Sequence, residues 1–316
     1  MRALVLNEKL SFDPHYAQPA PRRGESLVRV HMAGICGTDL ELASGYMTYS
    51  GIPGHEFIGH VQESADSRMI GMRVAGEINA ACGTCDFCLA ELGRHCVNRT
   101  VLGIVGRDGS FADYLTLPNE NLVPIPDALS DEVAVFIEPV AAAYEIFAQT
   151  QIGRNQTIAV LGDGRLGAVV AMVLKGEGYR PLLAGHHEEK LQCLARLGIA
   201  VELEAKLNSG FDVVIDSSGS SAGFNRAATL VKPRGRLILK STAAASAPMN
   251  LAPLVVNEIT VVGSRCGRFA PAVAALAEDK LDPRPLISAH YPLEQAVEAF
   301  AAASIPANFK VLLNIS

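Results

Sequence analysis

The sequence contains no tryptophan, and aromatic residues make up only 6% of its 316 residues. It has no run of five basic residues, and its net charge of −6 at pH 7 disfavours a nucleic acid or an anionic membrane as partner. The longest apolar run, around Leu166–Leu174, is far shorter than the ~20 residues that a membrane span needs. The opening MRALVLNEKL lacks a signal peptide's apolar core and predicts a strand. We therefore expect a cytoplasmic protein with no membrane or nucleic-acid partner.

The length of the chain predicts about two domains, because a single core rarely grows beyond ~250–300 residues. Up to about residue 135, short apolar runs separated by glycine and proline indicate an irregular β-rich domain. From about residue 155, buried strands alternate with helical segments, which indicates an α/β domain with a parallel sheet. The expected strands are 25–34, 73–78, 111–117, 121–126, 157–162, 180–185, 211–219, 236–241, 258–264 and 310–315. The expected helices are 165–178, 188–198 and 222–230, with a turn at 233–235.

Cysteine is scarce and unevenly spread, and seven thiols, an odd number in a long chain, do not indicate a disulfide framework. Four of them follow the spacing C-x2-C-x2-C-x7-C within residues 82–96. Four thiolates around one ion form a closed tetrahedral site, as structural zinc requires. A ferredoxin-type cluster is the alternative, but its motif continues with C-x3-C-P, whereas here the last gap is seven and Val97 follows. The predicted structural zinc ligands are Cys82, Cys85, Cys88 and Cys96.

A glycine-rich motif, LGDGRLG, directly follows the strand expected at 157–162 and opens the next helix. In that setting G-x-G-x-x-G is typical of a loop whose backbone approaches the pyrophosphate of a dinucleotide at a helix N-terminus. A tight turn without a ligand is the alternative. The predicted cofactor loop comprises Gly162, Asp163, Gly164, Arg165, Leu166 and Gly167.

The end of the second expected strand bears on the choice between NAD and NADP. An acidic residue there bonds the adenosine ribose of NAD, but this position holds Gly185, followed by His186 and His187. No carboxylate at that position would repel a 2′-phosphate, and the histidines could donate to it, so the sequence favours NADP. The histidines could equally be solvated surface residues, and Glu188 or Glu189 would restore an NAD preference by bonding the ribose.

A second set of metal-ligating residues is spread along the chain. Cys36 lies in GICGTD, His55 in PGHEFIG, and Glu138 in FIEPVA, where a carboxylate in an apolar run is costly unless it is paired or metal-bound. One thiolate, one imidazole and one carboxylate leave a fourth position open, as a catalytic zinc requires.

These motifs, in this order, resemble the zinc-dependent medium-chain dehydrogenase/reductase family, in particular its polyol and threonine dehydrogenase branch. The resemblance covers nearly the whole chain and includes DGSFADY and FDVVIDSSGS. It implies a GroES-like distorted β-barrel catalytic domain over 1–141 and 265–316, which contains the zinc lobe 82–96. It also implies a doubly wound Rossmann domain over 142–264.

The resemblance implies two zinc ions per chain and hydride transfer between an alcohol and NAD(P), giving an aldehyde or ketone. Thr38 would then take the substrate's proton, Asp39 would orient His55, and Glu56 would approach the zinc directly or through water. Arg265 follows the last expected strand of the Rossmann domain and could reach the cofactor; a surface salt bridge is the alternative. In one branch of the family a histidine five residues after the cysteine continues the relay; this chain has Glu41 there, so either Glu41 or water completes the relay.

The apolar strand at 258–264 predicts an edge that pairs with a second subunit, giving a homodimer or homotetramer. The expected partner is otherwise a small-molecule alcohol or carbonyl compound: a simple alcohol, a polyol or an amino alcohol. Two other functions remain as alternatives. One is a zinc-free quinone or enone reductase of the same superfamily, and the other is a non-catalytic dinucleotide-sensing protein.

Overall fold

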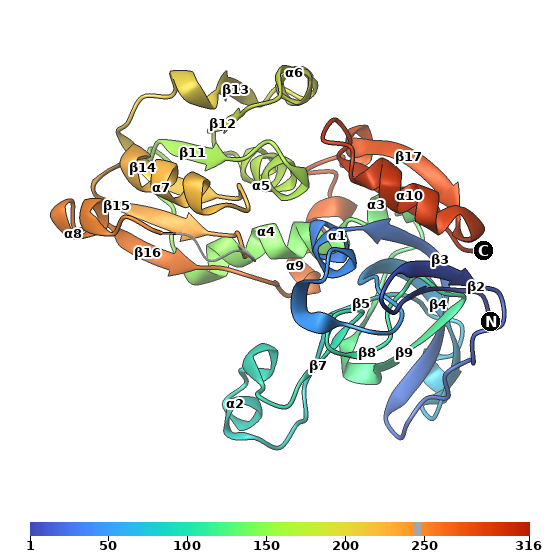
Figure 1. Ribbon diagram of the computed structural model, residues 1–316. Helices are drawn as coiled ribbons and strands as arrows, with labels where there is room; N and C mark the ends of the chain where they lie inside the picture. The colour runs from blue at the N-terminus through green and yellow to red at the C-terminus, as the bar shows by residue number, and fades with distance from the viewer. Residues whose placement is uncertain (243–247) are drawn as a thin grey trace. The chain divides into compact units, whose positions relative to one another are not determined.

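The computed structural model describes residues 1–242 and 248–316 (Figure 1). The chain divides into two compact units. The first comprises Met1–Glu138 and Phe269–Ser316, and the second comprises Pro139–Arg268. These limits lie three and four residues from the boundaries expected from the sequence, 141 and 265.

The first unit is built on a seven-stranded sheet whose order is β10-β5-β4-β3-β18-β17, with β9 also pairing with β3. All pairs in this sheet are antiparallel except β17 with β18. The long strand β3 is central because it pairs with β4, β9 and β18, and it therefore joins the early and last parts of the chain. The strands are β3 (Glu25–Ile35), β4 (Glu56–Ser64), β5 (Arg73–Gly76), β9 (Tyr114–Pro118), β10 (Leu122–Pro124), β17 (Ile287–Pro292) and β18 (Lys310–Asn314).

Smaller elements complete this unit. They include the pair β1–β2, the three-stranded sheet β6-β7-β8 and several short helices. The minor strands are β1 (Ala3–Leu6), β2 (Leu10–Asp13), β6 (Asn79–Ala80), β7 (Thr100–Leu102) and β8 (Gly106–Arg107). The α-helices are α1 (Gly37–Ala43), α2 (Asp86–Leu89), α3 (Asp131–Ala134), α9 (Phe269–Ala277) and α10 (Ala296–Ala303). The 3-10 helices are η1 (Tyr46–Thr48), η2 (Ser67–Met69), η3 (Gly93–His95), η4 (Asn119–Asn121), η6 (Arg284–Leu286) and η7 (Leu293–Gln295).

The second unit is a six-stranded, fully parallel sheet with the order β13-β12-β11-β14-β15-β16 (Figure 1). The chain starts in the middle, proceeds to one edge, returns and proceeds to the other, so the order reverses between β11 and β14. Ligands of doubly wound sheets bind at such a reversal, outside the carboxyl ends of the strands. The strands are β11 (Ile158–Leu161), β12 (Pro181–Gly185), β13 (Ala200–Leu203), β14 (Phe211–Asp216), β15 (Val231–Leu239) and β16 (Thr260–Gly263).

Helices connect these strands, and they cover the central strands, which are buried on both faces. All four residues of β11 are buried, and α5 packs on β11 and β12 while α7 packs on β14 and β15. The helices are α4 (Ile137–Gln149), α5 (Arg165–Gly176), α6 (Glu188–Arg196), α7 (Ser221–Leu230) and α8 (Ala252–Val256), with the 3-10 helix η5 (Glu204–Lys206).

The predicted fold class is confirmed, and each expected strand and helix is present. Most are a few residues shorter than expected, but β3 and α7 are one residue longer, β9 is shifted towards the C-terminus, and β15 begins five residues earlier. One local prediction is wrong: the segment 233–235 does not end a helix in a free turn but lies inside β15. There the pairing with β14 is interrupted, since Phe211 pairs with Val231 but Val213 pairs with Arg236. The extra residues are taken up by a bulge, and Arg234 adopts a φ of 62°. In the described part of the chain, we find no helix with the length and apolar character needed to cross a bilayer.

Candidate metal centres and dinucleotide loop

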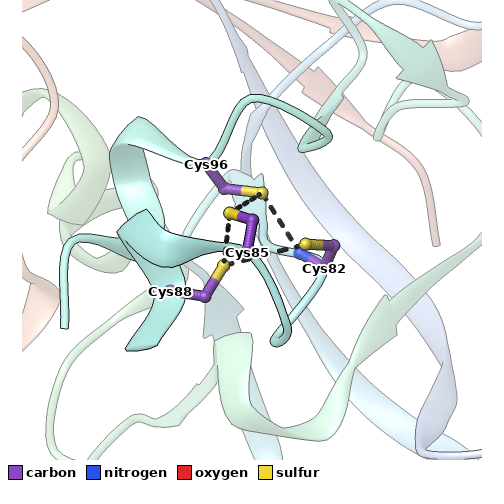
Figure 2. A group of neighbouring side chains, drawn as sticks. All are labelled: Cys82, Cys85, Cys88 and Cys96. Carbon is purple, nitrogen blue, oxygen red and sulfur yellow. Dashed lines mark hydrogen bonds between the residues drawn. The ribbon is translucent and has the colours of Figure 1, made fainter. Parts of the chain in front are cut away.

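The four clustered cysteines converge on one point (Figure 2). The Sγ atom of Cys85 lies 3.5 Å from that of Cys88 and 3.7 Å from that of Cys96, and the Sγ atoms of Cys82 and Cys88 are 3.9 Å apart. Thiolates at ~2.3 Å from a tetrahedral zinc would be about 3.8 Å from one another. The cysteines are therefore spaced for one shared ion, which supports the predicted zinc lobe over the iron–sulfur alternative.

A second group forms where β3 ends and β4 begins. Cys36 follows β3 and precedes α1, His55 precedes β4, and Glu56 is the first residue of β4. The register of the sheet pairs Gly34 with Glu56, which brings the two chain segments together. One ligand atom from each of Cys36, His55 and Glu56 lies within 4.8 Å of the others. Both His55 and Glu56 are buried.

Asp39, in the first turn of α1, contacts the segments that carry Cys36 and His55. Its Oδ2 accepts a hydrogen bond from the Cys36 amide at 2.7 Å, and its Oδ1 accepts one from the Gly54 amide at 3.2 Å. Oδ1 also lies 3.3 Å from Nδ1 of His55. Burial lowers the pKa of His55, but the carboxylate of Asp39 and the thiol of Cys36 outweigh burial and raise this pKa well above its usual value. Asp39 is thus placed to orient the His55 ring, as carboxylates behind metal-binding histidines do.

The carboxylate of Glu56 shows that the group fits a cation. Its Oε2 bonds Nζ of Lys310, whereas its buried Oε1 has no hydrogen-bond partner within residues 1–242 and 248–316. A buried charged oxygen without a partner costs free energy, and an ion beside Cys36 and His55 would remove that cost. Thiolate, imidazole and carboxylate are all ligands that zinc takes in proteins. The residues present therefore fit a zinc ion.

The other residues predicted for this site lie on two helices. Thr38 is half-buried in α1, two residues after Cys36. Glu41 lies one helical turn further along the same helix, and burial raises the pKa of its carboxyl. Glu138 is half-buried in the first turn of α4. It is not part of the described group, in which Glu56 supplies the carboxylate, and its role as a ligand stays a prediction.

The glycine-rich loop joins β11 to α5 at the point where the strand order reverses. A Cβ at Gly167 would overlap the carbonyl oxygen of Gly162, so this helix approaches the strand as closely as only glycine allows. Gly164 is the N-cap of α5 and makes no side-chain cap, and the first amides of a helix, which have no partner within it, suit an anion. Arg165 and Leu166 form the first turn of the helix and are half-buried.

Asp163, in the same loop, holds the segment after β12. Its Oδ2 accepts hydrogen bonds from the amides of His186 and His187 at 2.8 and 2.7 Å, and its Oδ1 lies 3.0 Å from Nδ1 of His187. Burial raises the pKa of Asp163, but these donors outweigh burial and the net pKa is lowered. A Cβ at Gly185 would overlap the Asp163 carboxylate. The structure thus explains the glycine: a carboxylate from the neighbouring loop occupies its side-chain space.

The remaining predicted cofactor residues are exposed. His186 lies 2.9 Å from Glu204 through Nε2, and the side chain of His187 is 48% exposed. Arg265 follows β16, and its carbonyl accepts a hydrogen bond from the buried Lys240 at 2.8 Å.

Sequence reasoning missed two residues of the metal group. Lys310 is the first residue of the apolar strand β18 and is buried. A single lysine at the start of an apolar strand could have been interpreted as a buried cation with an acidic partner. Gly34 leaves the space that the Glu56 carboxylate fills. Nothing in the sequence distinguished Gly34 from the other 27 glycines.

Comparison with known proteins identifies the class of this chain. Residues 22–127 match the family model described as an alcohol dehydrogenase GroES-like domain, and residues 166–279 match the one described as a zinc-binding dehydrogenase. The chain belongs to the zinc-type medium-chain dehydrogenase/reductase family.

Individual relatives narrow the class further. A sorbitol dehydrogenase from Halalkalibacterium halodurans is 28% identical over 94% of this chain and 93% of its own length. A solved short-chain alcohol dehydrogenase from Escherichia coli CFT073, complexed with NADH, has a TM-score of 0.92 and 26% identity, covering 100% of this chain and 99% of its own. A zinc-binding dehydrogenase from Sinorhizobium meliloti 1021, bound to NADP, has a TM-score of 0.91 and 25% identity, covering 99% of each chain. The protein is thus an oxidoreductase that acts on alcohols.

Proposed function

We propose that the protein is a zinc- and NAD(P)-dependent dehydrogenase that interconverts a small alcohol, polyol or amino alcohol with its aldehyde or ketone. The observation that carries this proposal is the group of half-buried Cys36 with buried His55 and Glu56, in which one carboxylate oxygen has no hydrogen-bond partner among the described residues. Zinc, when bound there, supplies a Lewis acid that polarises the substrate oxygen, while a nicotinamide exchanges the hydride. A reducing cytoplasm, where we propose that the protein works, keeps its thiols free for metal.

The chain's own residues then prepare the proton transfer. Asp39, whose Oδ1 lies 3.3 Å from Nδ1 of His55, is our candidate for orienting the ring. Thr38 is the nearest hydroxyl in sequence to Cys36 and is our candidate for receiving the substrate's proton. Glu41, whose carboxyl pKa is raised by burial, lies one turn away on the same helix and is the candidate for passing the proton to solvent. Thr38→Val should lower kcat about 10²–10⁴-fold, as loss of an acid–base group does, and leave bound zinc unchanged.

We further propose that the cofactor is NADP. Two observations support it: the Asp163 carboxylate that lies beside Gly185 is already held by two amides and His187, and Lys190 and Arg165 supply positive charge near it. Burial chiefly lowers the pKa of Lys190; the charge of Asp163 opposes this effect and that of Arg165 adds to it, so Lys190 lies within electrostatic reach of both residues. Positive charge there suits a 2′-phosphate.

A paired substitution tests this choice. Asp163→Gly together with Gly185→Asp moves the carboxylate to the end of β12 without the overlap that the single Gly185→Asp variant would cause. We expect the dissociation constant for NADPH, measured by fluorescence titration, to rise at least ~10-fold, while that for NADH falls. Tighter NADH than NADPH binding by the unaltered protein would contradict the NADP proposal and leave the dehydrogenase proposal intact.

The first experiment on the function itself is elemental analysis of the purified protein beside Cys36→Ala, with an alcohol panel assayed against NADP and NAD. About two zinc ions per chain, falling to about one in the variant, and alcohol-dependent reduction of the cofactor would support the proposal. About one zinc in both proteins, even after zinc is added, would favour the zinc-free quinone or enone reductase. Cofactor binding without turnover of any alcohol, quinone or enone would favour the dinucleotide-sensing alternative.

We also propose that two copies associate through β16, the edge strand of the parallel sheet. Val261 on this strand is 41% exposed, and Val255 and Val256 on the neighbouring α8 are 75% and 78% exposed. An exposed apolar edge with unpaired backbone groups pairs readily with its own copy. Val261→Lys should lower the mass measured by light scattering to that of the monomer. Val297→Lys, on α10 and also 41% exposed before substitution, is the matched control and should leave the mass unchanged. A monomeric unaltered protein would contradict the proposal.

A further inference from the structure

Lys310 is a buried cation directly behind the metal group. Only 3% of the residue is exposed, and its Nζ bonds Oε2 of Glu56. The same Nζ lies 3.5 Å from the carbonyl oxygen of Ile35 and 5.6 Å from the centre of the Phe136 ring. A buried ammonium is costly unless it is paired, so these contacts make the Glu56 carboxylate its main partner.

The two oxygens of Glu56 therefore have different surroundings. Oε2 is bound by Lys310, whereas Oε1 is buried and has no hydrogen-bond partner in the described chain. Since a carboxylate can bind a metal through one oxygen or both, a cation on Oε2 leaves only Oε1 for the metal. We propose that Lys310 is a positioning residue of the metal centre: it competes with the metal for Glu56 and restricts this carboxylate to one-oxygen binding. This inference rests on the proposed metal site at Cys36 and His55.

The sheet is built to bring this pair together from distant parts of the chain. β3 pairs with β4 so that Gly34 faces Glu56, and β3 pairs with β18 so that Gly34 faces Leu312, two residues after Lys310. A Cβ at Gly34 would overlap Oε2 of Glu56 and would lie 3.4 Å from Cδ of Lys310. The ion pair thus fills a space that exists because β3 has a glycine there.

The competition has a defined consequence for metal affinity. The positive charge of Lys310 repels a divalent ion nearby, and its hydrogen bond withholds one carboxylate oxygen from it. Lys310→Met keeps the apolar length of the side chain and removes both effects. Substitutions behind metal ligands typically change affinity 10–100-fold, and here we expect the change to be at least ~10-fold toward tighter binding. Lys310→Arg, which keeps the charge, should bind metal like the unaltered protein.

The probes are Zn²⁺ and Co²⁺ alone. The Zn²⁺ dissociation constant is measured by chelator competition, and the Co²⁺ absorption spectrum reports the coordination of the metal. In both measurements the signal of the Cys36→Ser protein is subtracted, so that metal bound to the four-cysteine lobe does not contribute. We expect tighter Zn²⁺ binding and an altered Co²⁺ spectrum for Lys310→Met. If that variant does not fold, Lys310→Gln, which keeps a hydrogen-bond donor without the charge, should show the same direction of change.

Two controls separate this inference from general destabilisation. Lys240→Met removes a lysine that is similarly buried, at 7% exposure, but is bonded to the Ala142 and Arg265 carbonyls and the Ser264 hydroxyl instead of to a metal-group residue. It should leave metal binding unchanged. In a Glu56→Gln background, Lys310→Met should lose its effect, because the two residues act as a pair.

The outcomes are distinguishable. If Cys36→Ser binds as much metal as the unaltered protein, the proposed metal site itself is wrong. If Cys36→Ser loses one metal but Lys310→Met binds metal equally or more weakly, with an unchanged Co²⁺ spectrum, only the role of Lys310 is overturned.

Discussion

The two thiol-containing groups of this protein are built in opposite ways. The four-cysteine lobe draws all its ligands from residues 82–96, where short turns, α2 and η3 bring the sulfurs together, and Cys82 is exposed. The group at Cys36 draws its parts from β3, β4 and β18, and Glu56 and Lys310 are almost fully buried. A local segment can thus gather four like ligands without a core. The group at Cys36 combines a thiol, an imidazole and a carboxylate, and the pairing of β3 with β4 and β18 brings these residues and Lys310 together.

The largest expected difference between the two groups is in activity. Cys36→Ser should lower kcat/KM at least ~10³-fold, because a Lewis acid is worth several kcal/mol and each ~1.4 kcal/mol is tenfold in rate. Its thermal unfolding should remain close to that of the unaltered protein. Steady-state kinetics and calorimetry of both proteins measure these effects. Full activity in Cys36→Ser would contradict a catalytic role for the group at Cys36.

Loss of a ligand in the four-cysteine lobe should instead lower stability. Cys85→Ser removes one of four ligands of a closed site and should cost several kcal/mol of local stability, because structural zinc binding is folding free energy. Hydrogen exchange should show amides 82–96 losing protection while the amides of β3 and β4 keep theirs. Cys193→Ser, a half-buried thiol on α6, is the control and should change neither. Unchanged exchange in Cys85→Ser would mean that the lobe does not depend on metal.

Gly34→Ala tests whether the buried group depends on close approach of the strands. The added Cβ would overlap Oε2 of Glu56, so the ion pair must shift, and we expect a loss of about 1–3 kcal/mol in the free energy of unfolding. Gly37→Ala is the control, because a Cβ there meets no atom within 4 Å. Urea unfolding of both variants measures the difference in the free energy of unfolding. Equal values would show that the Glu56–Lys310 pair can shift to accommodate a Cβ at Gly34 without loss of stability.

The smallest effect concerns a histidine pair in the same unit that belongs to neither group. Nε2 of His31 lies 3.2 Å from Nδ1 of His60, and Asp131, Arg29 and Arg73 face them. Burial first, then His60, lowers the pKa of His31 below 6.5, and the attraction of Asp131 only partly offsets this.

Because the folded protein binds this proton more weakly than the unfolded chain, the contribution of His31 to stability is complete above about pH 6.5. It should decrease, by about 1 kcal/mol or less, as the pH falls through the lowered pKa. His60→Gln should reduce the difference between unfolding free energies measured at about pH 7.5 and about pH 5.5. An identical pH dependence in both proteins would exclude the pair as its cause.

Much of this arrangement was predictable, for reasons that differ from residue to residue. The lobe cysteines and the loop from Gly162 to Gly167 were predictable because their spacing is local and their chemistry is repetitive. The gathering of Cys36 and His55 was predicted from their ligand chemistry together with the resemblance to a family, because no local spacing joins residues 19 positions apart. Lys310 and Gly34 were missed because their partner, Glu56, is distant in sequence, and only strand register places the three at one point.

The sequence by itself determined the two-unit α/β organisation, the closed thiol lobe and the dinucleotide loop, since each depends on periodicity or on ligands a few residues apart. Only the tertiary structure decided that the carboxylate of Asp163 fills the space beside Gly185, and that Lys310 bonds one oxygen of Glu56 while the other has no hydrogen-bond partner among the described residues. These contacts join side chains from different strands. Their geometry is set by sheet register and burial, which no local pattern encodes.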